Sequence, residues 1–431
     1  MNYIEQEIAN LERMIKKIEE HPDPNRLKSN KQGYEIQRDM RMGQIEDWKE
    51  GKPVLSIIEF QSLARAMGFS VIDGTALANR RSARHPEDTL ASLHDLRSRG
   101  FPTNCCDGPL VGLGMRISGQ LPPPNLAMAW GACDPATMTS LALAEYYDIP
   151  IFYYDCPQVD RVDNDVLEYL TNQILEFIEF AEAKVPGVKF DEEKLAELQE
   201  VDALAFPYFQ ENYELRKRVP CPLPARDAFR IPIAPSRFPD PQKALEYIIA
   251  STAELKERAE TKTSSIADEK LRLGWTVTAP LYRNVFKQCE ERGVAIPIII
   301  TGLTAKTFMT KYTLENDGIK EYGRKLSPLE KEVIKAAYTT WWGVGTRWLE
   351  DVIDICRDLK VDGLLNFLQM GCTPTLGLKK LIEDKAEKEL NIQTIHLEGA
   401  YHDSEYMNDE LFDAQLNDFI DICLSRKESA M

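Results

Sequence analysis

Apolar residues recur at helical spacing in the first part of the chain. The positions are Ile4, Ile8, Leu11 and Ile15. Their successive spacings of 4, 3 and 4 residues place them on one face, which predicts an amphipathic helix. The prolines at 22 and 24 end this helix, because proline cannot continue its hydrogen-bond ladder. Residues 25–50 are polar and charged, and we interpret them as a helical or irregular arm.

Short runs of consecutive apolar residues predict buried β-strands farther along the chain. These runs are Val54–Ile58, Leu126–Trp130, Pro150–Tyr154, Leu273–Val277, Ala295–Thr301, Asp362–Leu368 and Thr394–Leu397. Helical patterns separate them, and the order strand, helix, strand indicates parallel pairing. We therefore predict an α/β fold: two doubly wound parallel-sheet domains, flavodoxin-like or Rossmann-like, with an N-terminal helical arm and a helical connector.

Four segments are expected from these patterns. Residues 1–50 form the helical arm and residues 51–185 the first α/β domain. Residues 186–262 form a helical and proline-rich connector, in which seven prolines fall between Val219 and Pro241. Residues 263–431 form the second α/β domain. The length of 431 residues agrees with two domains that each bury a core.

The net charge and the N-terminal sequence argue against several classes of function. The net charge of -17, without a cluster of Lys and Arg, argues against a nucleic-acid partner. The N-terminus lacks the pattern of a signal peptide, and no apolar run is long enough to span a membrane. We therefore expect a cytoplasmic protein. Its nine cysteines are then reduced, and they serve as metal ligands, nucleophiles or packing residues.

Two cysteines lie where a predicted parallel strand meets its helix. One turn reads Gly131-Ala132-Cys133-Asp134-Pro135 and the other Gly371-Cys372-Thr373-Pro374. Asp134 and Thr373 are expected to cap the two helices. Ligands of α/β sheets bind beyond the carboxyl ends of the strands, so both cysteines are expected in one cleft. A helix N-terminus is also expected to lower the pKa of a thiol there.

A third candidate position is the vicinal pair Cys105-Cys106, in a loop ahead of Gly112. Cys289, Cys356 and Cys423 lie in helical patterns and are interpreted as packing residues. No C-x-x-C or Cys/His spacing typical of zinc occurs. Three widely separated loop cysteines suit an iron–sulfur cluster better than zinc, and unrelated free thiols are the alternative.

Several runs resemble the 2-hydroxyacyl-CoA dehydratase and benzoyl-CoA reductase family. They are Leu121–Cys133, Ile149–Asp155, Val361–Leu365, Gly371-Cys372 and His396–Glu398, and the similarity extends from about residue 50 to 425. The resemblance implies a [4Fe–4S] cluster on Cys106, Cys133 and Cys372. Cys105 is the alternative first ligand, but Cys106 and Gly114 keep the family's spacing of eight residues.

The resemblance also implies partners: a homologous iron–sulfur subunit, an ATP-hydrolysing activator, ferredoxin as the upstream electron donor and an acyl-CoA substrate. Gly302–Thr307 lacks the second glycine and the spacing of a P-loop, so no nucleotide site is expected on this chain. Arg283 and Arg347 are candidates for pairing with CoA phosphates. Glu59 and His396 are candidates for catalytic proton transfer.

Many relatives carry a glutamate where this chain has Ser62, and the nearest acid here is Glu59. A dehydratase that relays protons needs a carboxylate close to its cluster. Because the acid lies at position 59 and not at position 62, the sequence favours an ATP-dependent aromatic acyl-CoA reductase of the benzoyl-CoA type. The first alternative is a subunit of an (R)-2-hydroxyacyl-CoA dehydratase, and the second is a double-cubane electron-transfer protein.

Overall fold

The computed structural model describes residues 2–57, 59–159, 161–227, 234–266, 268–301, 318–338 and 346–430. Its strands form two groups, one in each half of the chain. The first group is β1 (Val54–Ser56), β2 (Ser70–Val71), β3 (Leu126–Trp130) and β4 (Ile151–Tyr154). The second is β5 (Leu271–Thr276), β6 (Val294–Ala295), β7 (Ile299–Ile300), β8 (Gly363–Gln369) and β9 (Gln393–Gly399).

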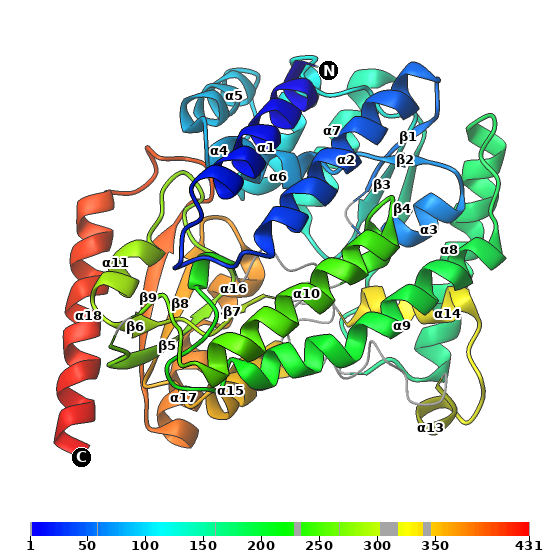
Figure 1. Cartoon of the computed structure of the whole chain (residues 1–431). Helices are drawn as coiled ribbons and strands as arrows, with labels where there is room; N and C mark the ends of the chain where they lie inside the picture. Colours follow the sequence, from blue (N-terminus) through cyan, green and yellow to red (C-terminus); the bar gives the residue numbers. More distant parts are fainter. Residues whose placement is uncertain are drawn as a thin grey trace.

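Both groups are parallel sheets, and they lie in different parts of the molecule (Figure 1). The first sheet has the order β2-β1-β3-β4. The second has the order β6-β5-β8-β9, with β7 also pairing β5. The predicted α/β fold with parallel sheets is thereby confirmed. The domain boundaries at residues 50, 185 and 262 stay predictions.

Helices connect and cover these strands. In the first half they are α1 (Asn2–Glu20), α2 (Asn30–Lys49), α3 (Gln61–Ala66), α4 (Gly74–Ser82), α5 (Pro86–Ser98), α6 (Asp107–Ile117), α7 (Asp134–Tyr147), α8 (Asn164–Lys184) and α9 (Glu192–Leu215). Two 3-10 helices follow, η1 (Ala225–Asp227) and η2 (Pro235–Arg237). The remainder are α10 (Pro241–Glu260), α11 (Phe286–Glu291), α13 (Ile319–Tyr322), α14 (Pro328–Ala337), α15 (Thr346–Asp358), α16 (Thr373–Gly377), α17 (Lys379–Leu390) and α18 (Asp409–Ala430).

Each sheet is covered by helices on both faces, and all the residues of β3, β5 and β8 are buried as a result. On the first sheet, α3, α8 and α14 pack on one face, whereas α4, α6 and α7 contribute to a separate apolar cluster with Val54. On the second sheet, α11 and α18 share one cluster, and α15 and α17 share another.

The arm and connector are helical. The helices α1 and α2 pack against each other, and Tyr3 and Ile4 of α1 enter the core formed by α4, α5 and α6. The long helices α9 and α10 lie side by side and cross the molecule between the two sheets (Figure 1). Between Val219 and Asp240, the described residues hold the two 3-10 helices η1 and η2 and no α-helix or strand.

The structure differs from the predicted elements in two places. Ala295–Thr301 was expected as one strand, but Pro297 separates two short strands, β6 and β7. The two-residue strand β2 was not predicted. Within the described residues, no helix combines the length and the apolar character needed to cross a membrane.

Candidate functional site

Three of the cysteines each stand immediately before a helix. Cys106 is the N-cap residue of α6, Cys133 that of α7 and Cys372 that of α16. The expected caps, Asp134 and Thr373, are instead the first helical residues, so that prediction is wrong by one position. Cys133 follows the carboxyl end of β3 and Cys372 follows that of β8, as the turns predicted.

The loops that carry these cysteines come together from both halves of the chain. Gly371 has a φ of +68°, and a Cβ on it would lie 2.6 Å from the Cys106 nitrogen. Only glycine allows this approach of the two backbones. A thiolate at Cys372 or Cys133 would raise the pKa of Cys106, and a thiolate at Cys372 or Cys105 would raise the pKa of Cys133. The backbone contact brings the loops of Cys106 and Cys372 together, and Cys133 lies within electrostatic range of both.

Cys105 and Cys106 have different surroundings. Cys105 is half-buried against the apolar cluster of α4, α5 and α6, whereas Cys106 is buried with its sulfur close to Gln369 of β8. Cys105 also lies within electrostatic range of Cys133, and the preference for Cys106 as the ligand stays a prediction. Cys289, Cys356 and Cys423 are at most 1% exposed within helices, in agreement with their interpretation as packing residues. Cys156 and Cys221 are also buried.

Burial dominates the electrostatics of the three thiols. It raises the pKa of Cys133 to about 12, and it also raises the pKa of Cys106 and Cys372. Amides at the helix starts, such as that of Ala136 beside Cys133, oppose the rise without cancelling it. The expectation of lowered pKa values was therefore wrong, because desolvation outweighs the helix N-terminus. Metal ligation would have to displace these protons.

The carboxylate of Asp107 joins the two halves beside Cys106. It is fully buried and accepts the backbone N–H groups of Tyr401 (3.3 Å), His402 (2.7 Å) and Asp403 (2.9 Å). Gln369 Nε2 donates to the same carboxylate at 2.8 Å. The sequence analysis missed Asp107 and Gln369. Their one local signal is that they adjoin cysteine-bearing turns.

Tyr401 was also missed. Its ring packs against Gly108 in the first turn of α6, and a Cβ on that glycine would lie 3.3 Å from the ring. Burial raises the pKa of the phenol, and the charges of Cys106, Cys372 and Cys133 raise it further. The same Cβ on Gly108 would lie 3.7 Å from the Cys106 sulfur, so the ring of Tyr401 lies beside Cys106.

Glu59 and Ser62 belong to a buried polar network beyond β1. Glu59 pairs with Arg237 at 2.8 Å, and its pKa is raised by burial although Arg237 opposes the rise. Ser62 lies 2.9 Å from Ser236 and accepts from Lys335 at 3.0 Å. Position 62, where the family resemblance led us to expect a glutamate, is thus part of a network that includes Lys335. No carboxylate among these contacts is free.

The other candidates are engaged elsewhere. His396 lies between β8 and α17, with Nδ1 3.1 Å from Asn366 Nδ2 and Nε2 3.5 Å from Glu383. Arg283 pairs with Asp409 (3.2 Å) and Asp413 (2.9 Å) of α18. Arg347 donates to the Ala337 carbonyl at 3.0 Å. The stretch Gly302–Thr307 lies outside the described residues.

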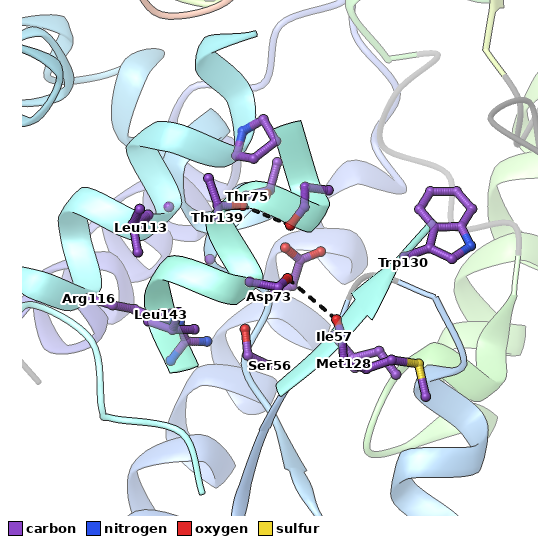
Figure 2. Close-up of a pocket in the computed structure, with 15 residues that line it drawn as sticks. Ser56, Ile57, Asp73, Thr75, Leu113, Arg116, Met128, Trp130, Thr139 and Leu143 are labelled. Carbon is purple, nitrogen blue, oxygen red and sulfur yellow. Dashed lines mark hydrogen bonds between the residues drawn. The ribbon is translucent and has the colours of Figure 1, made fainter. Parts of the chain in front are cut away.

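A small cavity lies between the first sheet and the helices α4, α6 and α7 (Figure 2). Its volume is about 50 Å³, and its labelled lining includes Ser56, Asp73, Arg116, Trp130 and Thr139. Asp73 caps α4 by accepting the Ala76 N–H, and Arg116 donates to the Pro122 carbonyl at 2.7 Å. Space of this size holds water rather than an acyl group.

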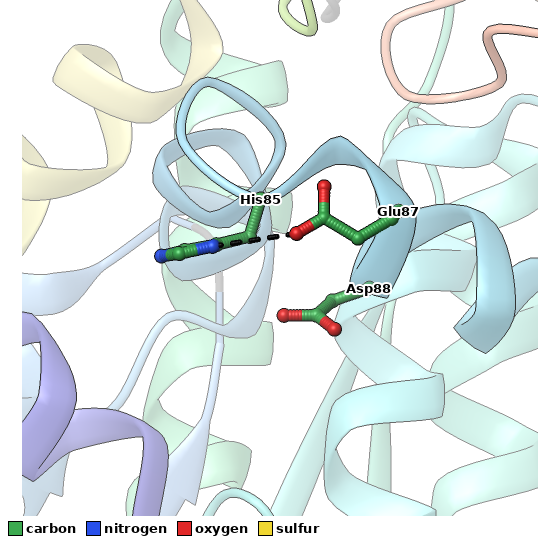
Figure 3. Close-up of side chains that lie close together, drawn as sticks. All are labelled: His85, Glu87 and Asp88. Carbon is green, nitrogen blue, oxygen red and sulfur yellow. Dashed lines mark ion pairs between the residues drawn. The ribbon is translucent and has the colours of Figure 1, made fainter.

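A second cluster of possible ligand atoms lies at the start of α5 (Figure 3). His85 Nδ1 is 3.4 Å from Glu87, and both side chains are exposed. Asp88 is already paired with Arg81. We interpret this cluster as solvated ion pairs.

The chemistry of the donor set can be compared with the needs of an iron–sulfur cluster. In the described part of the chain, Cys106, Cys133 and Cys372 are not a group whose sulfur atoms all lie within 4.8 Å of one another. Cysteine thiolates are the usual ligands of iron–sulfur clusters, so these three side chains are donors of the kind that such a group uses.

Comparisons with known proteins define the class. The family described as 2-hydroxyglutaryl-CoA dehydratase, D-component, matches residues 61–423, and the chain belongs to this family. The alpha subunit of (R)-2-hydroxyglutaryl-CoA dehydratase from Acidaminococcus fermentans is 23% identical over 297 residues. This match covers 67% of the present chain and 58% of the relative, so the chain spans little more than half of the relative's length. The dehydratase alternative thus has more support than the benzoyl-CoA reductase.

Proposed function

We propose that this chain is an iron–sulfur subunit of a 2-hydroxyacyl-CoA dehydratase. The observation that carries the proposal is the meeting of Cys106, Cys133 and Cys372, each at the start of a helix and each from a different loop. Family membership supports it. The N-terminal ends of the three helices favour the negative charge that thiolates would bring.

When bound by these three cysteines, a [4Fe–4S] cluster would supply single electrons and an iron position without a protein ligand. The chain itself contributes a buried environment, which strengthens electrostatic interactions and restricts water. Tyr401 keeps its proton beside Cys106, and we propose that it donates a hydrogen bond to a substrate oxygen bound there.

Partners form part of the proposal. The relative is named as one subunit of a dehydratase, which supports a second, homologous subunit here. We further propose an ATP-hydrolysing activator supplied by ferredoxin, and an acyl-CoA substrate. The benzoyl-CoA-type reductase remains the second candidate, because Glu59 pairs with Arg237 and Ser62 accepts from Lys335, so neither supplies the carboxylate that a proton relay near the cluster would use.

Iron and sulfide analysis of the chain purified without oxygen tests the cluster. We expect about four irons per chain and the visible absorption of an iron–sulfur protein. Cys133→Ala should lose most of the iron, whereas Cys105→Ala and the matched packing variant Cys289→Ala should keep it. Full iron content in Cys133→Ala would contradict the proposal, and about eight irons per chain would favour the double-cubane alternative.

Turnover distinguishes the two candidate reactions. A dehydratase complex should convert a 2-hydroxyacyl-CoA without consuming reductant in proportion to product. A benzoyl-CoA-type reductase should instead consume reductant with every product formed. Stoichiometric consumption with an aromatic acyl-CoA, and no reaction with 2-hydroxyacyl-CoA, would overturn the dehydratase assignment while leaving the cluster intact.

A further inference from the structure

Gln369 touches two of the three cysteines. It is the last residue of β8 and is completely buried. Its backbone carbonyl accepts the N–H of Cys372 at 3.0 Å, and its side-chain Nε2 lies 3.6 Å from the sulfur of Cys106. One residue therefore contacts ligand candidates from both halves of the chain.

The orientation of the Gln369 carboxamide is determined by Asp107. Nε2 lies 2.8 Å from a carboxylate oxygen of Asp107, and a carboxylate that accepts N–H groups must face a donor. Reversing the amide would set two oxygens against each other. The same Nε2 carries a second hydrogen, for which the Cys106 sulfur and the Met370 carbonyl (3.3 Å) are the acceptors.

The rest of the Asp107 environment leaves this second hydrogen available. Three backbone amides, from Tyr401, His402 and Asp403, already balance the carboxylate. The Asp107 carboxylate therefore does not depend on Gln369 as its only donor, and the second N–H of Gln369 Nε2 can donate to the Cys106 sulfur. An N–H···S contact in a fully buried position is electrostatically stronger than one in water.

We propose that Gln369 is a positioning residue that donates a hydrogen bond to the Cys106 sulfur and thereby raises the reduction potential of the cluster, an inference that rests on the proposed function. Reduction adds one electron from an external one-electron donor, and no bond forms or breaks. The added negative charge spreads to the cysteine sulfurs, so an N–H donor stabilises the reduced state more than the oxidised state.

Gln369→Met tests this inference, because methionine has a similar reach and lacks an N–H group. Wild type and variant are loaded with iron and sulfide without oxygen and titrated with a low-potential one-electron reductant. The reduced state is followed by electron paramagnetic resonance. We expect equal iron content and a more negative midpoint potential in Gln369→Met. Gln288→Met is the matched control, because Gln288 donates to Asp413 (3.0 Å) and its potential should equal that of wild type.

Gln369→His provides a rescue, because its ring N–H is a donor of similar reach. We expect it to return the midpoint potential toward wild type. If Gln369→Met folds but loses its iron, retention of iron by Gln369→His supports the positioning role, and loss in both variants overturns it. A loaded Gln369→Met with the wild-type potential overturns the inference alone. A wild-type chain without iron overturns the proposed function and this inference with it.

Discussion

Gly371 meets two requirements at a single position. Its φ of +68° is unfavourable for residues with a Cβ, and its Cα lies against the backbone of Cys106. We expect Gly371→Ala to lower the free energy of unfolding by roughly 2–4 kcal/mol, measured by urea denaturation. Gly119→Ala is the control, because Gly119 has a φ of +73° with open space around it. It should lose only about 1–2 kcal/mol. Equal losses would show that the backbone contact is unimportant.

His402 is a buried imidazole with no hydrogen-bond partner on either ring nitrogen among the described residues. Burial lowers its pKa from 6.5, and the charge of Asp107 opposes this shift. The unfolded chain therefore binds a proton at His402 at a higher pH than the folded chain does. Stability is unaffected above pH 6.5 and falls below it, by at most about 1.4 kcal/mol per pH unit.

His402→Phe should remove this acid sensitivity while keeping an aromatic ring at the position. We expect its free energy of unfolding to match or exceed that of wild type at pH 8, with an advantage that grows as the pH falls from 6.5 to 5. Urea denaturation at several pH values measures it. His94→Gln, at an exposed ion pair with Glu405, is the control. Parallel pH profiles for wild type and His402→Phe would disprove the assignment.

At the scale of elements, Lys335 connects α14 to three other segments through side-chain contacts. Its ammonium contacts Ser62 of α3, Asp202 of α9 (3.3 Å) and Ser236 of η2 (3.1 Å). Lys335→Met would remove a cation that lies 3.3 Å from the buried carboxylate of Asp202 and 3.7 Å from that of Glu332. We expect a loss of about 3–5 kcal/mol in the free energy of unfolding.

Thermal and urea denaturation measure the Lys335 effect. Lys256→Met is the control, because its pair with Glu211 is exposed and should be worth less than about 1 kcal/mol. Replacing both partners, as Lys335→Met with Asp202→Leu, should restore part of the loss. A single variant no less stable than the double variant would contradict the pairing.

Elements were predictable where a local pattern decided them. The strand β3 was predicted at its observed bounds, because five apolar residues stand between Asn125 and Gly131. The strand β2 was missed, because its two residues carry no pattern and exist through pairing with Val54 and Leu55. The helix starts shifted by one residue at Cys133 and Cys372, because neither sulfur is a favoured capping atom in sequence rules.

At the scale of the molecule, Asp107 connects the start of α6 to the loop after β9. Asp107→Asn replaces one carboxylate oxygen, which accepts hydrogen bonds, with an amide NH₂ group. This group would face N–H donors of the backbone. At least one of the amides at 401–403 then loses its partner, at a cost of about 1–3 kcal/mol. Hydrogen exchange of peptides covering residues 399–407 should become faster. Asp95→Asn, at an exposed pair with Arg99, should leave that exchange unchanged. Unaltered exchange in Asp107→Asn would contradict the link.

The sequence predicted only those parts of the candidate site that lie within a single turn. The cysteine-bearing turns were recognisable because each follows an apolar strand or opens a helix. Gln369, Asp107 and Tyr401 meet through contacts between residues far apart in the chain. No local pattern encodes such contacts. The pKa of the thiols was predicted in the wrong direction for the same reason, because burial depends on the whole fold.

The contact between Gly371 and the Cys106 loop has a consequence during synthesis. Because Cys372 follows Cys106 and Cys133 by more than half of the chain, a nascent chain presents two of the three cysteines long before the third emerges from the ribosome. A chain truncated before residue 371 would therefore carry Cys106 and Cys133 without the third cysteine, Cys372. Assembly of a three-cysteine site would have to wait until the late strand β8 and the turn that follows it have been synthesised and have folded.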